Sequence, residues 1–196
     1  MPPDPLARLL TEIRACRACA DLPLGPRPIV QAGAGARVLI IGQAPGTRVH
    51  ASGVPWDDDS GDRLRGWLGV ERETFYDPES IAVMPMGLCY PGKGPSGDLP
   101  PRRACAPLWH DRLRALLPRT RLTLLIGRHA QLRYLPAARR STMTEVVRRF
   151  AEAPPGLFAL PHPAWRSRIW MARNPWFEAE VLPVLRRRMA KALAAP

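Results

Sequence analysis

The cysteines are the residues whose type and spacing most directly indicate chemistry. Cys16 and Cys19 form a C-x-x-C pair, and Cys89 and Cys105 follow with fifteen residues between them. In a reducing compartment structural disulfides are uncommon, whereas a C-x-x-C turn and two distant thiols can complete a tetrahedral sulfur shell. Such a shell suits zinc or an iron–sulfur cluster. The alternative is four separate thiols, each buried in the core.

A second feature is the motif GQAPG at residues 42–46, which directly follows the apolar run VLII. Glycine and proline at these positions indicate a functional loop at the end of a buried strand. The motif holds no carboxylate, and neither Gln43 nor Ala44 can act as a base. The charge for a reaction must then come from elsewhere, and the segment SGVPWDDDSGD supplies acids at positions 57–59.

Apolar runs and turn signals predict the elements that must position these residues. Four short buried strands alternate with helices, which favours an α/β domain with a mainly parallel sheet. The motifs GQAPG and PHPAW both follow a strand, so they are expected to face one pocket at the carboxyl ends of the strands. The strands are expected at residues 37–41, 81–86, 122–126 and 157–160, and a glycine- and proline-rich loop at 89–101. The helices are expected at residues 6–15, 60–68 (with Ser60 as N-cap), 103–117, 128–135 and 174–193 (kinked at Pro183).

Length, charge and apolar pattern bound the class of protein. The chain has 196 residues and a formal net charge of +12, and all but two of its 29 basic residues are arginines. The length suits one domain over residues 1–196. A basic surface attracts polyanions, most often nucleic acid, although a compositional bias would also favour arginine over lysine. No segment is long and apolar enough for a membrane span, and the first residues lack a signal-peptide pattern, so we expect a cytoplasmic protein.

The motifs also follow one another in a family-specific order. A C-x-x-C pair precedes G-x-A-P-G, G-x-P-aromatic, two further cysteines, a strand ending in His-Pro, and Arg-Asn-Pro at the last helix. From Cys16 to Arg188 the chain thereby resembles the iron–sulfur-containing uracil-DNA glycosylases of bacteria and archaea. The resemblance implies a three-layer αβα sandwich with a central four-stranded, mainly parallel sheet. It implies that Cys16, Cys19, Cys89 and Cys105 hold a structural [4Fe–4S] cluster, with zinc less favoured, and that the partner is DNA. The sequence is silent on the oligomeric state, and we expect a monomer.

The resemblance also assigns roles at the strand ends. An enzyme of this kind breaks the bond between a base and its sugar after the base has left the stack. It needs an aromatic surface, donors for the departing oxygen, and a negative group or positioned water near the sugar. His162 matches the donor and Trp56 the stacking ring, the alternatives being a loop histidine satisfied by backbone and a core tryptophan. The positions expected to contact the substrate are Gly42, Ala44, Pro45, Gly46, Trp56 and Met84.

The chain departs from these relatives in its first motif. They commonly have Glu where Gln43 stands, or Asp where Ala44 stands, whereas Gln43 can only bind a base edge or orient a water. A further branch of the family has a neutral first motif and uses an Asp just before a Ser-Gly pair. The segment SGVPWDDDSGD resembles that branch. We therefore expect Asp58 or Asp59 to complete the catalytic set with Gln43 and His162. His50 is a weaker candidate for activating water, and the alternative for the acids is that they only cap the next helix.

A second departure concerns base selection. Relatives often have an Asn four or five residues before the third cysteine, where this chain has Met84 and Pro85. We therefore expect a pocket that also accepts deaminated bases other than uracil. Trp165, Arg166 and Arg168 follow the His-Pro motif and are expected to contact DNA through phosphates and stacked bases.

The sequence thus predicts a monofunctional DNA glycosylase that removes uracil or a related deaminated base and leaves an abasic site. No lysine lies near the pocket motifs to support a lyase step. The neutral first motif keeps a second hypothesis open, a catalytically weak or inactive DNA-binding protein on the same fold. A third hypothesis is a zinc-stabilised nucleic-acid-binding module.

Overall fold

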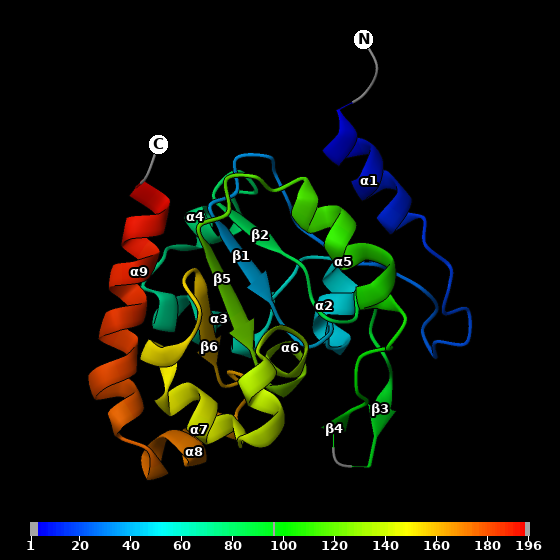
Figure 1. Ribbon diagram of the computed structural model, residues 1–196. Coiled ribbons are helices and arrows are strands. Elements are labelled where there is room, and N and C mark those ends of the chain that lie inside the picture. The colour runs from blue at the N-terminus through cyan, green and yellow to red at the C-terminus, as the bar shows by residue number, and fades with distance from the viewer. Residues whose placement is uncertain (1–3, 96, 195–196) are drawn as a thin grey trace.

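The computed structural model, which describes residues 4–95 and 97–194, is built around one four-stranded sheet. Its strands are β1 (Val38–Ile41), β2 (Ile81–Val83), β5 (Leu122–Ile126) and β6 (Leu157–Leu160). Their order is β2-β1-β5-β6, and every neighbouring pair is parallel, as the arrows in Figure 1 show. The predicted parallel α/β sheet is confirmed, although β2 ends three residues earlier than expected.

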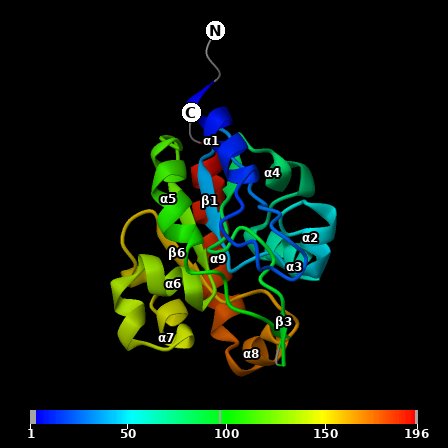
Figure 2. The same cartoon turned by 90° about the vertical axis from the view of Figure 1, so that its right-hand side faces the viewer.

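Helices cover both faces of this sheet. Leu39 and Ile41 of β1 pack with one set of helices, while Val38 and Ile40 pack with the other, because successive strand residues point to opposite faces. The first set is α1 (Pro5–Arg14), α5 (Cys105–Ala115) and α6 (Arg128–Tyr134). The second set is α3 (Asp59–Leu68), α4 (Arg72–Tyr76) and α9 (Leu182–Ala194). The result is the expected three-layer sandwich, with α5 and α6 on one side of β1 and α3 on the other in Figure 2.

Several short elements were not predicted from the sequence. They are α2 (Thr47–Ser52), α4, α7 (Met143–Arg148), α8 (Ser167–Arg173), and the 3₁₀ turns η1 (Pro136–Arg140) and η2 (Phe150–Glu152). In addition, β3 (Lys93–Gly94) and β4 (Gly97–Asp98) pair antiparallel, which corrects the expectation of a plain loop at residues 89–101. Ser96 of that segment lies outside the described residues. Elements this short contain too few residues to show a hydrophobic period.

The closing helix differs from the single kinked helix expected over residues 174–193. A π-helical turn, η3 (Phe177–Val181), comes first, and α9 begins directly after it. Pro183 lies in the first turn of α9 and has no N–H to donate to the preceding turn. The interruption therefore falls just before the proline, where the backbone adopts the wider π geometry.

The carboxyl ends of the strands meet at one edge of the sheet. This edge carries the β3–β4 hairpin and α8, at the bottom of Figures 1 and 2. By contrast, α1 begins and α9 ends at the opposite, amino-terminal edge. None of the helices in the described ranges has the length and apolar character needed to cross a membrane.

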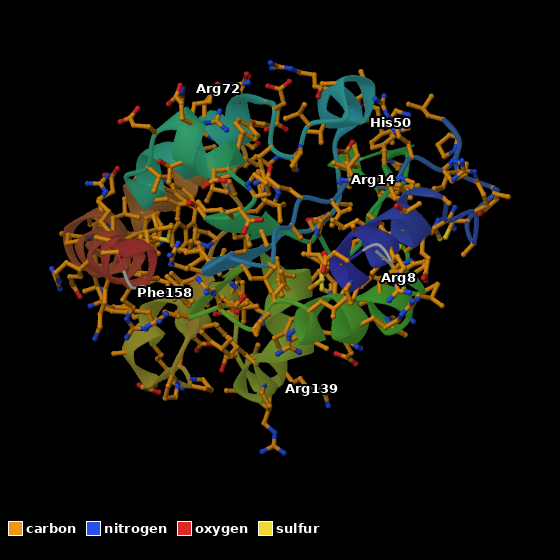
Figure 3. The ribbon with its side chains drawn as sticks, turned by 90° about the horizontal axis from the view of Figure 1, so that it is seen from above. Arg8, Arg14, His50, Arg72, Arg139 and Phe158 are labelled. Atoms are coloured by element: carbon orange, nitrogen blue, oxygen red, sulfur yellow. The ribbon has the colours of Figure 1, made fainter. Side chains whose placement is uncertain are left out.

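The positive charge is distributed around the molecule. Arg8 and Arg14 of α1, Arg72 of α4 and Arg139 of η1 lie on different sides when the molecule is seen from above, and Arg139 extends into solvent (Figure 3). The net charge of +12 therefore does not by itself single out one face for a polyanion. A DNA-binding face has to be located from the functional site instead.

Candidate active site

A cavity of about 490 Å³ opens at the carboxyl edge of the sheet. Its wall contains all of residues 42–46, which follow β1, together with Trp56, Asp58 and His162. Trp165 and Arg166 complete the same wall at the start of α8. Parallel strands bring segments that are distant in sequence to one edge, which explains why these motifs meet there. Three predicted site residues, Asp59, Met84 and Arg168, are absent from this wall.

Trp56 forms an aromatic side of the cavity, and its backbone is strained. Its φ of 58° lies in the left-handed region that non-glycine residues rarely adopt. The Tyr76 hydroxyl and an Arg65 N–H both donate to the Trp56 carbonyl, at 3.3 and 3.4 Å. Gly42 lies directly beneath the ring, since a Cβ there would come within 2.8 Å of the indole. The fold thus holds the ring in one place, against the first motif.

His162 lies beside this ring. The centroids of the two rings are 5.6 Å apart, and their planes are inclined by 34°. Burial lowers the pKa of His162, whereas the charge of Asp58 opposes that shift. The imidazole is therefore neutral near pH 7, and one of its nitrogens carries an N–H that can donate into the cavity.

The chain on both sides of His162 is anchored by hydrogen bonds. The fully buried Gln131 donates to the carbonyl of Leu160 at 2.9 Å, and Arg63 of α3 donates to the carbonyl of Pro163 at 2.7 Å. Two bonds from different helices therefore hold the backbone on either side of His162. Because both acceptors are backbone carbonyls, neither contact could be predicted from the residue types.

The acids at positions 57–59 point in three directions. Asp57 is paired with Arg72 at 3.2 Å, and this hydrogen bond lowers the pKa of Asp57. Asp59 is paired with Arg48 at 2.7 Å, and 87% of its side chain is exposed. Only Asp58 of the three lines the cavity. Of the two acids expected to supply charge, the geometry therefore favours Asp58.

Asp58 also begins α3, which corrects the predicted cap. One of its carboxylate oxygens accepts from the backbone N–H of Gly61 at 2.9 Å, whereas Ser60 lies inside the first turn. Aspartate is a strong N-cap, so this bond stabilises the helix. Asp58 therefore does cap the helix, as the alternative held. The cap uses one carboxylate oxygen and leaves the other to face the cavity.

Met84 is placed differently from the expectation. Its side chain is fully buried in the core between the sheet and α5, and its backbone N–H donates to the carbonyl of Ile40 at 2.9 Å. Its neighbours Val83 and Pro85 line the cavity instead. The chain stays extended for one residue beyond β2, and Met84 packs on the opposite side of the sheet from Val83.

The residues expected to contact DNA divide into two groups. Trp165 is 66% exposed, and the guanidinium of Arg166 lies over its ring at 5.3 Å, both at the cavity mouth. Arg168 faces another side of α8, where it lines a shallow groove with Arg63 and Trp67. An exposed tryptophan next to a cavity is able to stack on a base, whereas Arg168 lies away from the cavity.

Two further residues lie where the sequence did not lead us to expect them. Asp98, on β4, lines the cavity although no motif pointed to it. His50, considered for water activation, does not line the cavity, and its ring faces Tyr90 at a centroid distance of 6.1 Å. Asp98 lies in a glycine- and proline-rich run between two cysteines, and only the hairpin geometry brings it to the cavity.

All four cysteines line a second, narrow cavity with apolar walls such as Leu88 and Trp109. The pKa of the Cys89 thiol is raised to about 11, mainly by burial and in smaller part by the other three thiols. Thiolates in such a place need a cation to balance them. In the part of the chain that the structure describes, however, no three His, Cys, Asp or Glu side chains are arranged to hold a metal ion. The predicted metal site is therefore not confirmed.

A buried histidine supports the cavity from behind. His110 of α5 is fully buried, with Nε2 3.1 Å from the carbonyl of Pro85 and Nδ1 2.6 Å from the hydroxyl of Tyr134. Nε2 must carry the proton, because a carbonyl can only accept. Burial, the largest cause, lowers the pKa of His110 to about 4. The helix that begins at Cys105 is thus tied to the loop that carries Pro85.

Acidification is expected to destabilise the protein through His110. Its pKa is about 4 when folded and about 6.5 when unfolded, so the unfolded state takes up the proton first as the pH falls. The contribution of the neutral His110 to the free energy of unfolding is fully present above about pH 6.5. It is lost as the pH falls toward 4, an effect of ~3 kcal/mol. Urea unfolding at pH 7 and pH 4.5 measures this loss. His110→Gln cannot titrate and should lose less over the same interval, and equal losses would contradict the assignment.

A protein-family model described as "Uracil DNA glycosylase superfamily" matches residues 30–186 of the chain. The match contains the first motif, Asp58 and His162, and it includes Cys89 and Cys105 while leaving out the C-x-x-C pair.

Proposed function

Because the chain belongs to the uracil-DNA glycosylase superfamily, we propose that it hydrolyses the N-glycosidic bond of uracil or a related deaminated base in DNA. Members of this superfamily generally act on N-glycosyl bonds in DNA. The observation that carries the proposal for this chain is the cavity in which Trp56, Asp58 and His162 meet. The product would be an abasic site in a DNA strand.

The target base would enter the cavity after leaving the stack. Trp56 offers a flat apolar surface for stacking, and Gln43 offers an amide that can both donate to and accept from a base edge. Trp165 and Arg166 at the mouth would fill the space left by the base and hold a phosphate, while Arg168 would contact the flanking strand. The wall next to β2 offers Pro85, which has no side-chain hydrogen-bond donor, so base selection would be relaxed.

The chemistry requires two opposite charges to be stabilised. As the bond between C1′ and the base nitrogen breaks, its electron pair leaves with the base, and the sugar becomes cationic. The neutral His162 would donate its N–H to the base oxygen on which negative charge develops. Asp58 would hold a water molecule, whose oxygen bonds to C1′ and whose proton passes to the carboxylate. Neither lysine of the chain, Lys93 or Lys191, lines the cavity, which supports hydrolysis without a lyase step.

Single-turnover cleavage tests this proposal. Excess protein is mixed with a labelled single-stranded oligonucleotide carrying one uracil, followed by alkali and a gel. A strand break at the uracil is expected, with breaks at a second deaminated base in a matched panel. Tight binding of the same DNA without a break at any base would indicate a DNA-binding protein on this fold instead. Uracil as the sole efficient substrate would contradict the relaxed selection.

We further propose that the four cysteines hold a [4Fe–4S] cluster. A single zinc ion requires all four sulfurs within about 2.3 Å of one point. In a cluster each cysteine binds its own iron, so four thiols around one apolar cavity can serve without converging on a single ion. The superfamily includes iron–sulfur members. Such a cluster would supply only cross-linking, tying the segment after α1 to the start of α5.

Anaerobically purified protein is expected to contain about four iron atoms per chain and to absorb broadly in the visible range, as the cluster requires. Cys89→Ser should lose most of the iron and the absorbance, and its melting temperature should fall. Tyr90→Phe, a change at the next residue, serves as the matched control and should keep both. One zinc and no iron per chain would indicate a zinc module, and the absence of both metals would indicate four separate thiols.

A further inference from the structure

The β3–β4 hairpin brings a second carboxylate to the active-site cavity. Lys93 and Gly94 pair with Asp98 and Gly97, and Gly97 has a φ of 133°, which glycine adopts without a steric penalty. One oxygen of Asp98 accepts from the hydroxyl of the buried Tyr90 at 3.4 Å. The other oxygen is left to face the first motif.

The carboxylates of Asp98 and Asp58 converge on the same small space. A Cβ placed on Gly46 would lie 3.6 Å from Asp98 Oδ2 and 3.9 Å from Asp58 Oδ2. The glycine thus leaves open a space that a side chain would fill, and each carboxylate turns one oxygen toward it. The ion pairs found within residues 4–95 and 97–194 involve neither acid.

Two carboxylates that form no ion pair in the described part of the chain oppose each other's charge, so this space favours a positive group. His162 and Trp56 line the other part of the cavity, where the base would sit. The sugar attached to that base would then lie toward Gly46, between the acids. Bound DNA would exclude water from the mouth and strengthen their attraction for a cation.

We propose that Asp98 is a second catalytic carboxylate, which stabilises the positive charge that develops on the deoxyribose. This inference rests on the proposed glycosylase function. Asp98 takes no proton: the electron pair of the C1′–N bond leaves with the base, the water oxygen bonds to C1′, and the proton passes to Asp58. The two acids therefore divide the role of the carboxylate that is absent from the first motif.

Binding to abasic-site analogues tests the inference without turnover. One oligonucleotide carries a cationic pyrrolidine in place of the sugar, and a matched one carries neutral tetrahydrofuran. The wild-type protein should prefer the cationic analogue, and Asp98→Asn should reduce this preference about tenfold. Asp59→Asn, whose parent carboxylate pairs with Arg48 outside the cavity, is the matched control and should leave the preference unchanged.

The outcomes separate a catalytic acid from a charge at the DNA interface. An acid that merely repels phosphates would, when removed, tighten binding of both analogues equally, and that result would overturn the inference. An unchanged preference in Asp98→Asn would overturn it as well.

Single-turnover cleavage adds a second, independent measurement. Asp98→Asn should lower the rate about 10- to 100-fold at saturating protein, and Tyr90→Phe should lower it less. If the wild-type protein is active and Asp98→Asn cleaves at the full rate, the role of Asp98 is refuted while the proposed glycosylase function stands. A wild-type protein that cleaves no base would refute the proposed function, and the analogue preference would still decide whether Asp98 favours a cation.

Discussion

Asp58→Asn is expected to lower the single-turnover rate of base release by about 10²- to 10⁴-fold, because the substitution removes the group proposed to hold the water and accept its proton. The amide oxygen of asparagine can still accept from the N–H of Gly61, so the cap of α3 is retained. The loss of rate would then report on charge rather than on folding. Loss of the nearby charge would lower the pKa of His162 further and leave that imidazole neutral.

Asp59→Asn provides the control for this experiment. It removes an acid from the adjacent position, but that acid is paired with Arg48 at the surface. Its rate should stay within a factor of about three of the wild type, since an exposed ion pair contributes little. A full rate in Asp58→Asn together with an inactive Asp59→Asn would contradict this assignment. The acid that holds the water would then be Asp59.

His162→Asn is expected to lower the same rate by about 10²- to 10³-fold, the usual cost of losing one donor to a developing oxyanion. Asparagine has a shorter side chain and lacks the imidazole ring that lies beside Trp56. Because burial lowers the pKa of His162, the wild-type rate should show no step from this group between pH 7 and pH 8.

The control for His162 is His129→Gln. His129 lies on α6, is also partly buried, and does not line the cavity. Its replacement should leave the rate at saturating protein nearly unchanged. If His162→Asn cleaved as fast as the wild type while binding DNA equally well, the departing base would have to be stabilised by another donor, and Gln43 would be the next residue to test.

The sheet could be predicted from the sequence, but the short helices could not. The strands β5 and β6 begin and end at the expected residues, because each is a continuous apolar run between turn residues. The helices α2, α4 and α8 have five to seven residues each, and their apolar positions show no clear period. The hairpin was missed because its glycines and prolines also suit an irregular loop.

The site was predictable where it follows strand ends and not where it depends on distant contacts. The first motif and His162 follow β1 and β6, and parallel strands place such segments together. The choice between Asp58 and Asp59 needed the direction of each side chain, which depends on the cap of α3. Asp98 could not be foreseen, because its place depends on the fold of a hairpin outside the sheet.

The first and last helices have a practical consequence. Since α1 begins and α9 ends at the edge of the sheet away from the cavity, a partner domain fused before α1 or after α9 would not cover the cavity opening. The same geometry allows attachment to a bead through either end while the opposite edge faces the solution. A tether at either of these helices would therefore leave the cavity accessible.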